Sequence, residues 1–152
     1  MVSPLKALIV DQVEALRELG YERVAYASSD LSPEQKNEVY RRVREGEVDR
    51  FLSFPPELLL AYDISYFVGE RRIGLVVVDE AHTVTTWGKE FRVDYWFLGR
   101  HLETLKNALG YVFPVFALTA TAVWNPEGGN DMIFDTIRSL HLAPVCPCMW
   151  AR

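Results

Sequence analysis

The spacing between apolar residues differs from one segment of this chain to the next, and these differences predict alternating strands and helices. Short, nearly continuous apolar runs predict strands at 1–3, 23–27, 51–54, 73–78 and 112–118. Apolar residues at helical spacing predict helices from 5 to about 19, from 33 to about 46, near 58–60, from 96 to 108, and from 130 or 131 to about 140. This alternation is typical of an α/β fold in which a mostly parallel sheet of five strands is flanked by helices.

Local signals define several helix ends and helix faces. Ser32 offers an N-cap hydroxyl, Pro33 suits the first helical position, and Gln35 completes a capping box. Gly20 supplies the stop for the first helix. In two later helices the apolar residues form a stripe that should face the core: Leu98, Leu102, Leu105 and Leu109 in the first, and Ile133, Phe134, Ile137 and Leu140 in the second.

The strand predicted at 73–78 ends abruptly in two adjacent carboxylates, Asp79 and Glu80. Such an end is typical of a site that hydrolyses a nucleoside triphosphate, where one carboxylate holds Mg²⁺ and its neighbour orients or deprotonates the attacking water. The alternative is a buried strand followed by a solvated acidic turn. A pattern this short leaves both interpretations open.

Two hydroxyl residues follow the strand predicted at 112–118, namely Thr119 and Thr121. Ligands of open parallel sheets bind at the carboxyl ends of the strands, so Asp79, Glu80 and these two threonines should share one edge. A hydroxyl turn beside the acid pair could respond to the presence of a γ-phosphate through a hydrogen bond. The alternative for the threonines is ordinary turn chemistry at a strand end.

Composition limits the possibilities further. With 152 residues, 49% of them apolar and 12% aromatic, the chain is expected to form one domain. The net charge of −5 argues against a broadly cationic surface that coats nucleic acid. Cys146 and Cys148 are expected to be reduced thiols, and no apolar stretch reaches the length of a membrane span. An intracellular protein without a membrane partner is expected, cytoplasmic in a prokaryote or nuclear in a eukaryote.

Four segments, in order, resemble the first motor domain of RecQ-type helicases within helicase superfamily 2. They are 2–5 continuing to 11–13, which resembles motif Ia; Asp79-Glu80-Ala81-His82, which matches the DEAH box; 87–95, which resembles the aromatic-rich loop; and 117–122, which matches motif III. The resemblance covers nearly the whole chain. It implies an incomplete RecA-like, P-loop NTPase domain at 1–143 and a tail at 144–152 that leads toward a second motor domain.

The resemblance also implies roles for individual residues. Asp79 would coordinate Mg²⁺, Glu80 would position or activate the hydrolytic water, and His82 would couple the nucleotide site to motif III and to the aromatic-rich loop. Thr119 and Thr121 would join Asp79 and Glu80 in binding ATP. The expected partners are ATP, single-stranded or forked DNA, and the remainder of the helicase. DNA would be contacted by the following residues: Ser3, Pro4, Trp87, Phe91, Arg92 and Tyr95.

The aromatic-rich loop has two interpretations. Flat faces at Trp87, Phe91 and Tyr95 suit sequence-independent base stacking, and Arg92 could add a phosphate contact. Their four-residue spacing would also place all three rings on one helical face, which favours core packing.

The chain departs from the family pattern in ways that affect its expected activity. It begins inside motif Ia, and it contains no Gly-x-Gly-Lys-Ser/Thr loop to hold phosphates. We therefore expect a fragment of a 3′-to-5′ DNA helicase that is inactive alone, with an unprotected sheet edge where the first strand is missing. The alternative is a stand-alone, degenerate DNA-binding or interaction module without ATPase activity.

Overall fold

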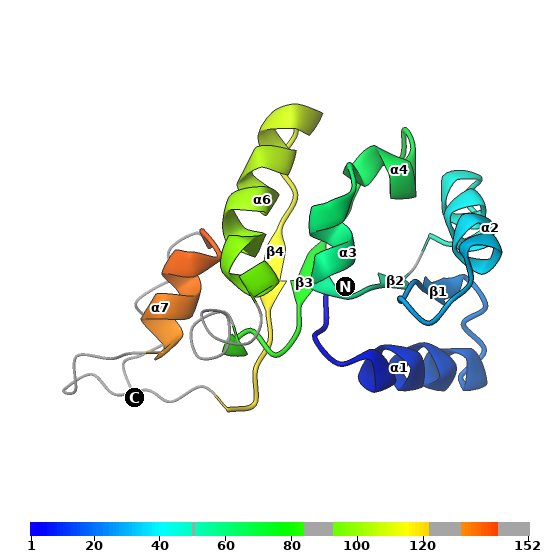
Figure 1. The fold of residues 1–152 in the computed structure, drawn as a ribbon, viewed down its shortest axis with the longest axis horizontal. Helices are drawn as coiled ribbons and strands as arrows, with labels where there is room; N and C mark the ends of the chain where they lie inside the picture. The colour runs from blue at the N-terminus through cyan, green and yellow to red at the C-terminus, as the bar shows by residue number, and fades with distance from the viewer. Residues whose placement is uncertain (50, 84–92, 122–131, 143–152) are drawn as a thin grey trace.

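A computed structural model describes residues 1–49, 51–83, 93–121 and 132–142 of the chain. Helices and strands alternate along it (Figure 1). The elements are α1 (Lys6–Glu18), β1 (Val24–Tyr26), α2 (Pro33–Arg44), β2 (Phe51–Ser53), α3 (Pro56–Ala61), α4 (Ile64–Val68), β3 (Val76–Val78), α6 (Val93–Leu109), β4 (Val115–Ala117) and α7 (Met132–Ser139). The predicted α/β class is therefore confirmed.

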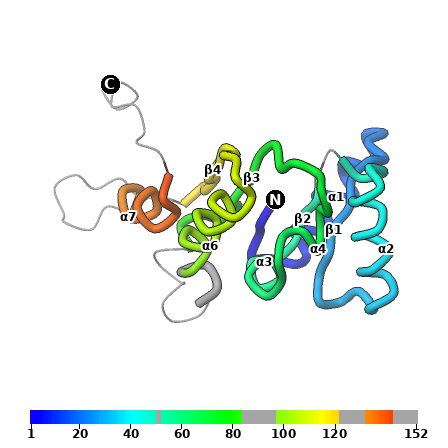
Figure 2. Tube along the Cα trace, turned by 90° about the horizontal axis from the view of Figure 1, so that it is seen from above, coloured from blue at the N-terminus to red at the C-terminus, as the bar shows by residue number. Residues whose placement is uncertain are grey.

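The N-terminal segment joins two pairs of parallel strands. β1 pairs with β2, with Val24 opposite Phe51, and β3 pairs with β4, with Val76 opposite Val115. Val2 forms parallel bridges to Phe54 and to Val78, so it lies between the two pairs. The order across the sheet is β1, β2, Val2, β3 and β4. Figures 1 and 2 both place α2 at one end of this row and α7 at the other.

Some element boundaries follow from the local signals, and others differ from the prediction. Ser32 caps α2, because its side chain accepts from Gln35 N–H while the Gln35 side chain accepts from Ser32 N–H. The predicted strands 73–78 and 112–118 are shorter than expected, with regular pairing limited to β3 and β4. α6 begins at Val93, three positions earlier than expected. The short helix α4, which starts after an Asp63 N-cap, was not predicted.

The core is formed where α3, α4 and α6 cover the middle of the sheet. Its fully buried side chains include Val2, Phe67, Val78, Leu98, Leu102 and Phe113. Leu105 is also buried and Leu109 is partly buried, so the apolar stripe of α6 faces the core as predicted. Burial of apolar surface of this kind stabilises the fold by roughly 25 cal/mol per Å².

Apolar side chains remain exposed at the β4 end of the sheet. In the described part of the chain, β4 pairs only with β3. Phe116 on β4 is 56% exposed, and Val112 just before it is 82% exposed. The predicted burial of Phe134 in α7 is wrong, because that side chain is 53% exposed. The apolar stripe of α7 is therefore only partly covered by its neighbours.

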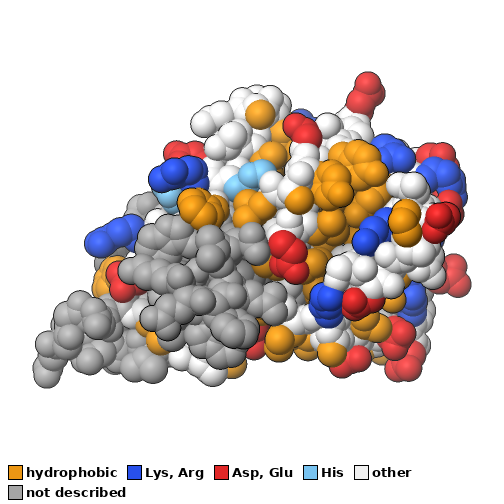
Figure 3. All heavy atoms as spheres, in the orientation of Figure 1, with side chains coloured by type: hydrophobic (Ala, Val, Ile, Leu, Met, Phe, Trp, Pro, Cys, Tyr) orange, Lys and Arg blue, Asp and Glu red, His pale blue; other side chains and the backbone are white. Residues whose placement is uncertain are grey.

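The surface shown in Figure 3 has two distinct regions. Lysine, arginine and acidic side chains mix around α2, whereas apolar side chains gather over α3 and α4. Tyr62, which follows α3, and Tyr66 of α4 are both exposed, and their rings stack with centroids 5.3 Å apart. Among the described residues, no helix is both long and apolar enough to span a membrane.

Candidate nucleotide-hydrolysis site

The acid pair lies at the carboxyl end of β3, next to the N-terminal segment. Asp79 N–H donates to the Val2 carbonyl at 2.8 Å, which ties the strand end to that segment. Both Asp79 carboxylate oxygens accept hydrogen bonds. Oδ1 accepts from Glu80 N–H at 3.0 Å, and Oδ2 accepts from the Ser3 hydroxyl at 3.3 Å. The carboxylate is therefore held in one orientation by groups from two segments.

Glu80 turns the chain sharply away from the strand. Its φ of +49° lies in the left-handed region, which residues other than glycine seldom adopt. The turn is closed by Thr83 N–H, which donates to the Glu80 carbonyl at 2.9 Å, and by Ala81 N–H, which donates to Leu118 at 2.8 Å. Backbone strain of about 1–3 kcal/mol at such a position is common in active sites. The turn begins at Glu80, so the two consecutive carboxylates lie where β3 ends.

His82 joins the acid pair to the end of β4. Its Nδ1 lies 2.9 Å from Thr119 Oγ1 and 3.0 Å from Thr121 Oγ1. Glu80 Oε2 lies 3.3 Å from the same nitrogen. A hydroxyl can either donate to or accept from Nδ1, so the tautomer and charge of His82 decide the direction of these bonds. The prediction that Asp79, Glu80, Thr119 and Thr121 share one edge is confirmed.

The oxygen groups at this edge suit a divalent cation such as Mg²⁺. Asp79 and Glu80 provide carboxylates, which are the hard ligands that Mg²⁺ prefers. Oε2 of Glu80 is buried and has no hydrogen-bond partner in the described structure, although His82 Nδ1 lies 3.3 Å away. The described residues contain no group of three or more potential metal ligands.

Ser3 and Pro4, which the motif Ia resemblance assigns to DNA, both have buried side chains. Ser3 is 0% exposed, and its hydroxyl faces Asp79. DNA binding by this segment stays a prediction, and it would have to use backbone atoms. Sequence reasoning missed the contact between Ser3 and Asp79, because a serine at a strand end carries no local sign of its partner.

The aromatic-rich loop is largely beyond the described residues. Trp87, Phe91 and Arg92 lie outside them, and the backbone at Tyr95 belongs to α6 while its side chain is not described. The choice between base stacking and core packing for these rings therefore stays open.

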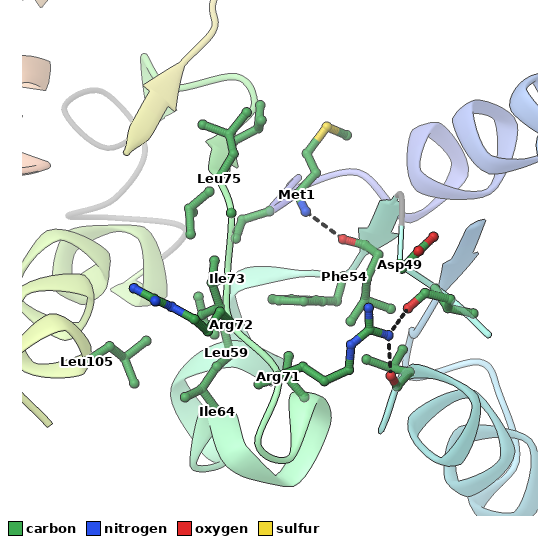
Figure 4. Close-up of a pocket in the computed structure, with 18 of the residues that line it drawn as sticks. Met1, Asp49, Phe54, Leu59, Ile64, Arg71, Arg72, Ile73, Leu75 and Leu105 are labelled. Atoms are coloured by element: carbon green, nitrogen blue, oxygen red, sulfur yellow. Dashed lines mark hydrogen bonds between the residues drawn. The ribbon is translucent and has the colours of Figure 1, made fainter. Parts of the chain in front are cut away.

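A cavity of about 390 Å³ lies at the opposite end of the strands, beside Met1 and the start of β3 (Figure 4). Its lining is mainly apolar, and its two arginines are already engaged. Arg71 donates to the carbonyls of Val43 and Val48, and the guanidinium of Arg72 lies 4.5 Å from the Tyr111 ring centroid. Neither Asp79 nor Glu80 lines the cavity.

Comparison with known proteins agrees with the predicted fold. The helicase domain of Hef from Pyrococcus furiosus has a similar structure, with a TM-score of 0.62 and 21% sequence identity over 95% of this chain and 27% of that one. The fold is therefore the RecA-like fold of helicase motor domains. A family model described as DEAD/DEAH box helicase matches residues 1–127, and the chain belongs to that family.

Two relatives from Bacillus subtilis (strain 168) specify the resemblance further. The probable ATP-dependent DNA helicase RecS is 38% identical over 122 residues, which are 80% of this chain and 23% of that protein. The ATP-dependent DNA helicase RecQ is 35% identical over 132 residues, which are 87% of this chain and 21% of that protein. The chain thus spans about a fifth of the length of these relatives. The resemblance to RecQ-type helicases is confirmed.

Proposed function

We propose that this chain is the part of a RecQ-type, ATP-dependent 3′-to-5′ DNA helicase that positions the metal ion and the attacking water. One observation carries the proposal: His82 Nδ1 lies within 3.3 Å of the Glu80 carboxylate and within hydrogen-bond distance of both Thr119 and Thr121. A solvated acidic turn would need no such connection to the neighbouring strand end. The relatives that carry the names RecS and RecQ support the same conclusion.

Asp79 and Glu80 have different environments, which supports different roles. Asp79 accepts hydrogen bonds on both oxygens and is held in place, as suits a ligand for Mg²⁺. Glu80 has no comparable restraint on Oε2, which lies 3.3 Å from His82 Nδ1 without a hydrogen-bond partner in the described structure, and its carboxylate is proposed to orient the attacking water. The chemistry that Mg²⁺ supplies when bound is neutralisation of charge on the phosphate oxygens.

His82 is proposed to transmit the state of the nucleotide to the end of β4. A change in the hydrogen bonds of Glu80 moves its carboxylate relative to His82 Nδ1, and the two threonine hydroxyls reorient in response. Thr119 lies two residues after the end of β4, so the response would pass toward a second strand. In this role Thr119 and Thr121 sense ATP together with the acid pair.

The proposed DNA contact is the loop with Trp87, Phe91, Arg92 and Tyr95, acting on single-stranded or forked DNA. Support comes from the sequence resemblance alone, since these side chains are outside the described structure. Base stacking on aromatic rings is worth about 1–3 kcal/mol per base and requires no particular sequence.

The 152 residues contain no Gly-x-Gly-Lys-Ser/Thr loop, so we propose that they hydrolyse ATP only together with the rest of the helicase. The test compares ATP turnover by the purified chain with turnover by a longer protein that contains it, each with and without single-stranded DNA. The chain alone should show negligible turnover. In the longer protein, Glu80→Gln should lower DNA-stimulated turnover by a factor on the order of 10²–10⁴.

A matched control is Glu14→Gln, because Glu14 is an exposed glutamate on α1, away from the acid pair. It should leave turnover unchanged. Retention of full turnover by Glu80→Gln would refute the proposed role of Glu80. DNA-stimulated ATP turnover by the isolated chain would refute the proposal that hydrolysis requires the rest of the helicase.

A further inference from the structure

Ser3 makes an unusual contact for a residue at the end of a bridging segment. Its side chain is 0% exposed, and its hydroxyl donates to Oδ2 of Asp79 at 3.3 Å. The other oxygen, Oδ1, accepts from Glu80 N–H at 3.0 Å. With both oxygens engaged, rotation of the carboxylate about the Cβ–Cγ bond is restricted.

The backbone around Ser3 is fixed on both sides. Ser3 N–H donates to the Phe54 carbonyl at 3.3 Å, next to β2. Val2 N–H donates to the Val77 carbonyl at 2.7 Å, and the Val2 carbonyl accepts from Asp79 N–H at 2.8 Å. The serine hydroxyl therefore has a defined position relative to the carboxylate, set by hydrogen bonds to two neighbouring strands.

Ser53 shows that burial alone does not explain this contact. Ser53 also ends a parallel strand, β2, and its side chain is also 0% exposed. Its hydroxyl oxygen has no hydrogen-bond partner in the described structure. Two buried serines at strand ends thus differ in one respect: only Ser3 has its hydroxyl on a carboxylate of the acid pair.

We propose that Ser3 is a positioning residue that holds the Asp79 carboxylate in the orientation needed to bind a divalent cation. The consequence for metal binding rests on the function proposed above. Residues that hydrogen-bond to a metal ligand orient it, and their loss commonly costs about 10–100-fold in affinity. At 3.3 Å the Ser3 contact is longer than the best hydroxyl hydrogen bonds, so the lower end of that range is expected.

The experiment compares Ser3→Ala with Ser53→Ala in the full chain. Two quantities are measured: the NMR chemical shift of the Asp79 carboxyl carbon, and the dissociation constant for Mn²⁺ from electron paramagnetic resonance. Ser3→Ala should shift the carbon resonance and weaken Mn²⁺ binding by about tenfold. Ser53→Ala should change neither, because its hydroxyl has no partner to lose.

The outcomes separate this inference from the proposed function. An unchanged resonance and an unchanged Mn²⁺ affinity in Ser3→Ala would overturn the role of Ser3, as would equal effects in Ser53→Ala. A second variant, Asp79→Asn, tests the proposed metal site itself through its Mn²⁺ affinity. If Ser3→Ala shifts the Asp79 resonance while Asp79→Asn leaves Mn²⁺ affinity intact, Ser3 still positions the carboxylate but the proposed metal site is wrong.

Discussion

Gly99 of α6 lies directly against the backbone at Ser139, at the end of α7. A Cβ atom placed on Gly99 would lie 2.0 Å from the Ser139 carbonyl oxygen and 2.9 Å from the Leu140 Cα. Both of these are backbone atoms, so neither can move aside without shifting α7. The absence of a side chain at position 99 is therefore what allows the two helices to pack together.

Gly99→Ala should lower the free energy of unfolding by about 1–3 kcal/mol, the usual cost of inserting a group into a packed interior. Chemical denaturation measures the change. Gly74→Ala is the control, because a Cβ there meets nothing within 4 Å. Equal stability of the two variants would contradict the close approach of α6 and α7.

The hydroxyls of Thr119 and Thr121 both lie within hydrogen-bond distance of the same atom, Nδ1 of His82. Each single variant, Thr119→Val or Thr121→Val, should reduce DNA-stimulated ATP turnover of the longer protein less than the double variant does. Thr119→Val should have the larger effect of the two, because Thr119 Oγ1 also accepts from Thr121 N–H at 3.3 Å. The double variant should reduce turnover by roughly fivefold or more, since a net hydrogen bond is worth about 1 kcal/mol. Steady-state turnover with saturating DNA provides the measurement.

The control for the threonine variants is Thr104→Val. Thr104 lies on α6, and its hydroxyl donates to the Arg100 carbonyl of its own helix at 3.0 Å. Turnover should be unaffected there. If the double variant at 119 and 121 behaves like the Thr104 variant, the link between His82 and β4 has no part in turnover.

Burial lowers the pKa of His101 below its ordinary value of 6.5, against the opposing effects of the Leu59 carbonyl and the Asp63 charge. Its Nε2 is buried without a hydrogen-bond partner in the described structure, which also favours the neutral ring. The folded state thus resists protonation. As the pH falls below 6.5, His101 is protonated in the unfolded chain before it is protonated in the folded chain. Protonation therefore stabilises the unfolded chain first, and the free energy of unfolding falls.

The difference in unfolding free energy between the wild-type chain and His101→Gln should therefore change with pH. Relative to the variant, the wild type should be less stable at about pH 5.5 than at about pH 7.5. Denaturation curves at both pH values give the comparison. A difference that does not depend on pH would mean that His101 titrates normally in the folded chain.

Ser32→Ala should destabilise the chain by about 1 kcal/mol, the typical value of an N-cap. The serine hydroxyl accepts from Gln35 N–H at 3.2 Å, and Gln35 Oε1 accepts from Ser32 N–H at 2.8 Å. Thermal or chemical unfolding measures the loss. The control is Ser29→Ala, in the exposed loop before α2, which should have little effect on stability. An equal loss of stability in the two variants would mean that the Ser32 cap does not stabilise α2.

Several features could be predicted from the sequence because they depend on neighbouring residues. The capping box of α2 is formed by residues three apart, and the stripe on α6 repeats within a single helix. The acid pair at the end of β3 was visible as a break from apolar to charged residues. These signals come from periodicity and caps, which act within one or two helical turns.

Other features escaped prediction for physical reasons. α4 has only five residues, too few to show a helical period, although Asp63 supplies its N-cap. Phe134 fits the apolar stripe of α7, yet it is exposed because the described neighbours of α7 cover only part of that stripe. Periodicity identifies an apolar face of a helix, but it does not determine how much of that face another element covers.

The sequence by itself determined the alternation of strands and helices apart from α4, the capping box of α2, and the place of Asp79 and Glu80 at a strand end. Only the tertiary structure decided that Val2 lies between β2 and β3, which brings the Ser3 hydroxyl to a carboxylate 76 positions away. It also decided that the hydroxyls of Thr119 and Thr121 both lie within hydrogen-bond distance of His82 Nδ1. The reason is that strand pairing depends on packing of the whole chain, whereas each local pattern reports only on its own segment.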